Sequence, residues 1–197
     1  MKRLTVALGL MLVAGAAYAF DPAPSREPVR IGILRAPAAY YYENAEHVHR
    51  AVVSSLRDRL RSRGFEVTLV DATYDELAHG ETRADADYFV EIAGDSRTED
   101  HGGVGVSGPH AAVSLGMMVS DVAADVFVYD GASLEELAHE SMSKRDKAFV
   151  PTGVGVGGAN IFAWIAAPMI ERAQVRGVAR DLGRDIASRV DGVVRGR

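Results

Sequence analysis

The sequence contains no cysteine among its 197 residues. This absence excludes disulfide bonds, so the folded protein must be stabilised by its hydrophobic core alone. It also excludes a lipid anchor of the bacterial lipoprotein type, which needs a cysteine directly after the signal segment, where this sequence has Ala19 and Phe20. Lysine is scarce, with 3 residues against 19 arginines, and the formal net charge is −5. The basic excess that is usual in nucleic-acid-binding domains is therefore missing, and we expect no nucleic-acid partner.

The chain also lacks a motif specific enough to name a reaction. Two glycine-rich segments match the G-x-G-x-x-G pattern of dinucleotide-binding loops, with glycines at Gly103, Gly105 and Gly108 and at Gly153, Gly155 and Gly158. That loop needs a preceding strand and a helix that opens within it, and neither segment shows both. We therefore expect no cofactor, and we interpret the Val-Gly alternation as closely packed strand or loop.

Three Glu-x-x-His pairs raise the possibility of a metal site: Glu46 with His49, Glu76 with His79, and Glu136 with His139. On a helix each pair would lie one turn apart, as in di-iron bundles, which take their ligands from four helices. Only two long helices are expected here, so exposed helix faces are the favoured interpretation. A metal-binding protein or a metal-dependent hydrolase that uses these pairs is the alternative function.

The N-terminus carries the features of a secretory signal. Lys2 and Arg3 precede an uncharged run, residues 4–20, which is short for a membrane span of about 20 residues. Ala17-Tyr18-Ala19 matches the small-x-small pattern of signal peptidase sites, so residues 1–19 are expected to be removed. Loss of Lys2 and Arg3, with no acidic residue, takes the net charge from −5 to −7. Residues 20–28 follow as a proline-rich leader.

Apolar periodicity predicts the elements of the mature chain. Two helices are expected, over residues 43–63, where Gly64 follows as a C-terminal glycine, and from Pro168 almost to the C-terminus. A short helical turn is expected at residues 73–79, and residues 132–147 fit either strand or helix. Strands are predicted at residues 29–34, 65–70, 88–92, 112–119 and 125–129.

This order predicts an α/β (α+β) fold in one domain, residues 29–197. We expect one mixed sheet of about five strands with two main helices packed on it. The first strand–helix–strand unit favours parallel pairing, and the closely spaced later strands favour antiparallel hairpins. Leu56 and Leu182 are expected to face the sheet, while Arg57 and Arg184 face solvent.

The candidate binding residues lie in and after an uncharged run, residues 148–170. Its glycines and prolines disfavour a continuous spanning helix, which leaves either buried loop and strand or an exposed apolar surface. A stripe of arginines at every fourth position follows, as either a solvated face or a site for acidic partners. The candidates for binding a partner or a membrane surface are Phe162, Trp164, Arg172, Arg176, Arg180 and Arg184.

The order of elements resembles a group of bacterial envelope proteins. The segments that carry the resemblance are residues 29–34, the helix that ends at Gly64, and residues 65–71, 86–90 and 126–131. The group comprises the curli secretion-channel lipoproteins, the N-terminal domain of the Tol-Pal β-propeller protein and the penicillin-binding-protein activator lipoproteins. The resemblance implies an α/β domain that binds envelope partners without catalysis. The missing lipidated cysteine puts stable membrane anchoring in doubt.

The leading hypothesis is an exported, non-enzymatic accessory or binding protein of the cell envelope. Its expected place is the periplasm of a Gram-negative bacterium, with association with the outer membrane left open. An envelope protein or a membrane surface is the expected partner, and no metal, nucleotide cofactor or nucleic acid is expected.

Overall fold

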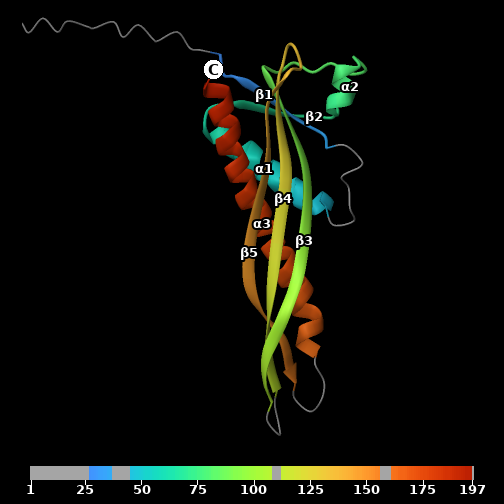
Figure 1. The fold of residues 1–197 in the computed structure, drawn as a ribbon, viewed down its shortest axis with the longest axis vertical. Helices are drawn as coiled ribbons and strands as arrows, with labels where there is room; N and C mark the ends of the chain where they lie inside the picture. Colours follow the sequence, from blue (N-terminus) through green and yellow to red (C-terminus); the bar gives the residue numbers. More distant parts are fainter. Residues whose placement is uncertain (1–26, 37–44, 108–111, 156–160, 197) are drawn as a thin grey trace, which may run out of the picture.

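The computed structural model describes residues 27–36, 45–107, 112–155 and 161–196. The predicted signal segment and most of the leader lie outside these residues. The described elements are, in chain order, β1 (Arg30–Leu34), α1 (Ala45–Ser62), β2 (Glu66–Val70), α2 (Tyr74–Ala78), β3 (Tyr88–Ser107), β4 (Ala112–Asp130), β5 (Glu136–Gly155) and α3 (Ile161–Arg195). They form one five-stranded mixed sheet in the order β2-β1-β3-β4-β5, which confirms the predicted fold class (Figure 1).

The first half of the chain follows the predicted pattern closely. β1 pairs in parallel with β2 and with β3, and α1 forms the crossover between β1 and β2. Gly64 ends α1 with a φ of +90°, a left-handed conformation that glycine adopts without steric cost. Thr73 caps α2: its side chain accepts a hydrogen bond from the Glu76 backbone, and the Glu76 carboxylate binds the Thr73 N–H.

The second half departs from the prediction in the length of its strands. Residues 112–119 and 125–129 belong to one strand, β4, and residues 88–92 are only the start of the 20-residue β3. The ambiguous segment, residues 132–147, is strand from Glu136 onward, where β5 begins. Antiparallel pairing runs unbroken through Ser120 and Asp121. Two polar residues in a row often mark the end of a strand, but the backbone hydrogen bonds of the sheet do not depend on side-chain polarity.

The glycine-rich segments lie in this long antiparallel sheet. Ser114 of β4 pairs with Gly105 on one side and with Gly153 on the other. The first two glycines of each segment are therefore in paired strands, as the Val-Gly alternation indicates, and not in a phosphate-binding turn. In Figure 1 these strands extend away from β1, β2 and α2 toward the bottom of the view. We call that end of the molecule, where α3 begins, the distal end.

The last helix begins earlier than predicted. α3 starts at Ile161, so Pro168 lies inside it and does not open it. Proline removes one backbone hydrogen bond and usually kinks or ends a helix, which is why the sequence alone places the boundary there. The helix is 35 residues long and runs back along β5 and β4 to the proximal end, which is the end opposite to the distal one.

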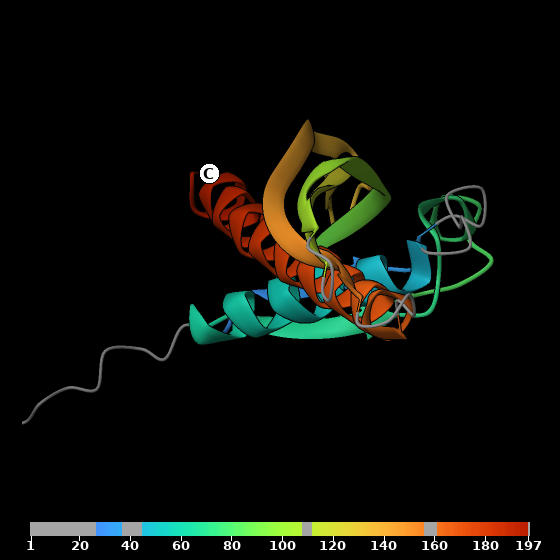
Figure 2. The ribbon, with the colours of Figure 1, turned by 90° about the horizontal axis from the view of Figure 1, so that it is seen from below.

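The main core lies between the sheet and the two long helices. Leu56 of α1 and Leu182 of α3 are fully buried there, whereas Arg184 is exposed, as predicted; Arg57 is partly exposed. Lys144 of β5 binds Asp185 of α3 at 2.5 Å, so even-numbered residues of β5 face the helices. Figure 2 shows that β3, β4 and β5 curl strongly while α1 and α3 lie together against the sheet. A smaller core, which includes Phe89 and Tyr129, lies beside α2 on the other face.

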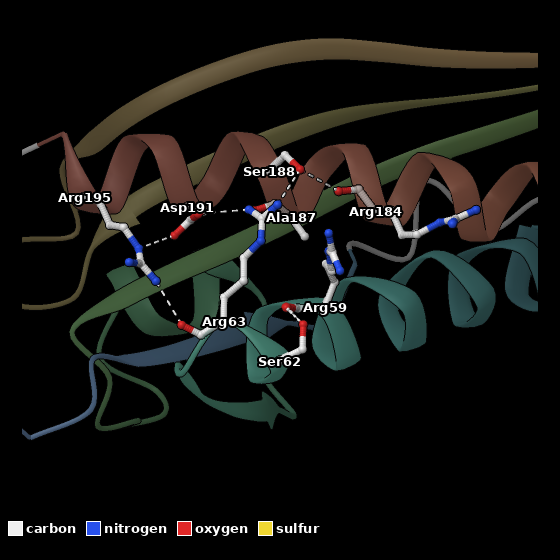
Figure 3. A network of polar contacts seen from close by, with 8 residues as sticks. All are labelled: Arg59, Ser62, Arg63, Arg184, Ala187, Ser188, Asp191 and Arg195. Atoms are coloured by element: carbon white, nitrogen blue, oxygen red, sulfur yellow. Dashed lines mark hydrogen bonds and ion pairs between the residues drawn. The ribbon is translucent and has the colours of Figure 1, made fainter.

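A polar clamp joins the C-terminal ends of α1 and α3 (Figure 3). The Arg63 guanidinium donates to Asp191 Oδ2 at 3.0 Å, to the Ala187 carbonyl at 3.2 Å and to Ser188 Oγ at 2.9 Å. Arg195 donates to Asp191 Oδ1 at 2.5 Å and to the Arg63 carbonyl at 2.9 Å. Because both cations share one half-buried carboxylate, the proximal ends of the two helices are held in one arrangement.

Candidate functional site

The sequence-predicted binding residues all belong to α3. Phe162 and Trp164 are in its first turns, where the side chains lie outside the described part of the structure. Arg172, Arg176, Arg180 and Arg184 are exposed. The four arginines recur every fourth residue, so they follow one side of the helix with a slow rotation about its axis.

Three of these arginines form an open cationic surface. Within the described residues, no hydrogen bond or ion pair engages the guanidinium groups of Arg172, Arg176 or Arg180. Met169, three residues before Arg172, is 68% exposed. We call Met169, Arg172, Arg176 and Arg180 together the arginine face. Arg184 differs, because it forms an ion pair with Asp181 on its own helix.

The arginine face ends where α1 begins to cover α3. Ser55 of α1 donates a hydrogen bond to the carbonyl of Arg180 at 2.6 Å. A Cβ placed on Gly183 would lie 2.5 Å from the Val52 carbonyl oxygen, so the two helix backbones touch at this point. Beyond it, toward the distal end, the same side of α3 lies open to solvent.

Exposed apolar side chains gather near the distal end. The described residues carry four large exposed ones, and three of them are at this end: Leu115 of β4 (48% exposed), Phe149 of β5 (75%) and Met169 of α3. Register pairs Leu115 with Pro151 and Phe149 with Met117, so Leu115 and Phe149 lie on neighbouring strands. The described parts of residues 148–170 thus include two highly exposed apolar side chains, as one of the two interpretations requires.

A second candidate site lies on the other face of the sheet and was not predicted from the sequence. A hollow of about 220 Å³ opens between β3, β4 and β5. Its walls include the small residues Ala93 and Ala123, with Asp125 and Ser141 beside them. Ala93, Asp125 and Ser141 are register neighbours on three adjacent strands, so they share the face that points away from α3. We call this cavity the outer hollow.

The polar groups at the outer hollow are arranged around one carboxylate. Ser141 Oγ donates to Asp125 Oδ1 at 2.5 Å. The His139 ring stacks on Phe127 with a centroid separation of 4.2 Å, and its Nε2 lies 4.0 Å from Asp125 Oδ1. Ser141 therefore donates to the carboxylate and not to the imidazole, so these three residues do not form a nucleophile–base–acid relay. The small residues that line the cavity follow no periodic pattern in the sequence, so the sequence did not reveal the cavity.

Nearer α2, the same face buries an acid. Glu91 is 7% exposed, and burial raises the pKa of its carboxyl group, while the hydrogen bond from Tyr129 Oη at 3.2 Å opposes that rise. Burial beside Glu91 also raises the pKa of Tyr129. Tyr74 stacks on Tyr129 at 4.2 Å and closes the site from the α2 side. Glu91 is thus held in the interior by packing.

The structure does not bring the Glu-x-x-His pairs together. Glu136 and His139 lie on β5, so the expectation of one helical turn is wrong for this pair. A register shift between them pairs Glu136 with Tyr129 and His139 with Phe127, so both lie on the same face of the strand. His79 is the C-cap of α2, and its Nδ1 lies 2.7 Å from the Asp75 carbonyl oxygen. His49 is in α1, where burial lowers its pKa. Among the described residues, no three His, Asp or Glu side chains are placed to hold a metal.

Comparison with known proteins gives only distant structural similarity. The chain matches no protein-family model and no curated protein. It is similar to a protein described as a neuraminyllactose-binding hemagglutinin homolog from Helicobacter pylori, with 8% identity, a TM-score of 0.49, and coverage of 86% of this chain and 91% of that one. It is also similar to a minor lipoprotein from Acinetobacter baumannii (10%, 0.38, 81% and 93%) and to a lipoprotein from Neisseria meningitidis (15%, 0.35, 77% and 99%).

Two of these three neighbours are bacterial lipoproteins, the broad class named by the sequence resemblance. The particular families named there stay a prediction. At TM-scores below 0.5 the likeness carries no functional information. Among the described helices, none has an apolar stretch long enough to cross a membrane.

Proposed function

We propose that the protein is an exported, non-enzymatic accessory protein of the bacterial cell envelope that docks on an anionic membrane surface through its distal end. The observation that carries the proposal is the combination found there. Three arginines without partners among the described residues follow an exposed Met169 on α3, and exposed Leu115 and Phe149 lie at the same end on the sheet face that points away from α3. The signal features of residues 1–19 support export.

The physical basis is additive attraction. Each arginine near an anionic membrane surface contributes about 1 kcal/mol, so three supply about 3 kcal/mol at low salt. A fully buried Leu, Phe or Met side chain contributes about 1.5–3 kcal/mol, and partial insertion into the headgroup region yields a part of that. Neither contribution alone gives stable binding, but together they suit a reversible surface contact that needs no lipid anchor.

Vesicle sedimentation tests the proposal with the chain that begins at Phe20. Binding is measured to phosphatidylglycerol-containing vesicles and to pure phosphatidylcholine vesicles at 50 and 300 mM salt. We expect binding to the anionic vesicles only, weakened by salt because surface charges are screened. Trp164 is the only tryptophan, so a blue shift of its emission on addition of vesicles would report directly on the start of α3.

The decisive variant replaces Arg172, Arg176 and Arg180 by glutamine. Its affinity for anionic vesicles should fall about 100-fold, which corresponds to about 3 kcal/mol. The matched control is a glutamine triple at other exposed arginines without described ion pairs, Arg59, Arg83 and Arg145, which removes the same charge. Equal losses in the two triples, or equal binding to both kinds of vesicle, would contradict the proposal.

A further inference from the structure

We propose that the outer hollow binds a small organic ammonium ion, with Asp125 as its counter-ion. The site is independent of the arginine face, because it lies on the opposite face of the sheet from α3. Three features of the outer hollow lead to this ligand class: the sign of its charge, the composition of its walls and its size.

The charge of the hollow is negative. Asp125 is the charged residue among the described residues that line it, and Ser141 and Ser143 supply hydroxyl groups. The Asp125 side chain is 45% exposed, so its carboxylate is accessible to a ligand. Oδ1 already accepts from Ser141, and within the described residues no donor reaches Oδ2. An ammonium group, which donates three hydrogen bonds and carries the opposite charge, complements this open acceptor.

The walls favour an organic cation over a metal ion. A metal needs several further oxygen or nitrogen ligands, and the imidazole nearest to the carboxylate, His139, stays 4.0 Å away from it. The remaining lining includes the methyl groups of Ala93 and Ala123, whereas the side chains of Ala124 and Met142 point toward the helices on the other face. Such walls contact an alkyl body, and they give a hydrated metal ion nothing to bind.

The size of the hollow limits the ligand. At a water molecule's share of liquid volume, about 30 Å³, the cavity holds roughly seven water-sized groups. A four-carbon amine fits this space. The hollow is open on one side because Ala123 is exposed, so such a ligand can enter without unfolding of the strands.

Titration of ¹⁵N-labelled protein with n-butylammonium tests the inference, with n-butyrate and n-butanol as probes of equal length. We expect saturable shifts confined to the amides of Gly94, Ala123, Asp125 and Ser141 with the ammonium ion only. Asp125→Asn keeps an acceptor for Ser141 but loses the charge, and should weaken binding at least tenfold. Ala123→Leu should abolish binding, since the larger side chain fills the hollow from its open side.

Asp121→Asn is the matched control, because Asp121 lies on the same strand and the same face as Asp125 but does not line the hollow. It should leave the affinity for butylammonium unchanged. Equal loss in Asp121→Asn, unchanged affinity in Asp125→Asn, or equal shifts with butanol would overturn the inference. Vesicle binding by Asp125→Asn should match the wild type, so failure of this inference is distinguishable from failure of the proposed docking.

Discussion

The two halves of α3 differ in what surrounds them, although both are rich in arginine. In the proximal half, Arg184, Arg189 and Arg195 each form an ion pair, with Asp181, Glu140 and Asp191 respectively. In the distal half, Arg172, Arg176 and Arg180 have no partner among the described residues. The difference is the supply of acidic side chains: Asp181 and Asp191 lie on the same helix, and Glu140 lies on β5.

The comparison shows that the role of an arginine in this helix depends on its neighbours in space. Arg195 pairs with Asp191 and donates to the Arg63 carbonyl, so it holds the ends of the two helices together. The arginines of the distal half keep their charge for an outside partner. The proximal half should therefore carry stability, and the distal half should carry binding.

The largest expected effect is a difference in stability between side-chain truncations in the two halves of α3, because only the proximal half is expected to be tightly packed. Leu182→Ala in the proximal half should lower the free energy of unfolding by about 2–5 kcal/mol, because the side chain is fully buried. Met169→Ala in the distal half should change it by less than about 0.5 kcal/mol. Urea denaturation midpoints measure both. Equal losses would show that the distal half is also packed against the protein.

A smaller effect uses two glycines of the same helix. Gly183→Ala should cost about 1–3 kcal/mol, since the new Cβ would lie 2.5 Å from the Val52 carbonyl oxygen. Gly177→Ala should add about 0.5–1 kcal/mol of stability, because none of the described atoms lies within 4 Å and alanine favours the helix. Denaturation of the two variants beside the wild type gives both changes. A stabilising Gly183→Ala would place α1 away from α3.

The smallest effect concerns pH and lies in the proximal half of the sheet. Burial raises the folded-state pKa of Glu91, so its stabilising contribution is complete below the unfolded value and is lost as the pH rises through the folded value. Glu91→Gln keeps an acceptor for the Tyr129 hydroxyl and removes the charge. Its melting temperature should therefore exceed that of the wild type more at pH 8 than at pH 4.

Glu81→Gln, at an exposed position, is the control for this pH comparison. Its difference in melting temperature from the wild type should be the same at pH 4 and at pH 8. A Glu91→Gln protein that melts below the wild type at pH 8 would show that the ionised carboxylate is stabilised where it lies.

Sequence reasoning succeeded where the signal is local. The spacing of Val48, Val52 and Leu56 predicts α1, and Gly64 predicts where it ends; the structure confirms both. It failed at Pro168 and at residues 120–124, where a residue that often ends an element lies within one. At residues 120–124, backbone pairing with β3 and β5 maintains the strand against the local preference.

The candidate sites divide in the same way. The arginine stripe is visible in the sequence, because residues four apart share a helix face. That three of its members have no partner among the described residues follows from where the acidic side chains of the fold lie. The outer hollow is decided entirely by the tertiary structure: Ala93, Asp125 and Ser141 come from three strands, and only antiparallel register makes them neighbours.

The sequence by itself therefore determined β1, α1 and β2, the face that each long helix buries and the charge that it displays, since these follow from periodicities of two and 3.6 residues. The tertiary structure alone decided how far the strands extend, that Arg189 pairs with Glu140 of β5, and where a cavity opens. These depend on contacts between residues far apart along the chain, and the free energy of such contacts leaves no periodic pattern in the sequence.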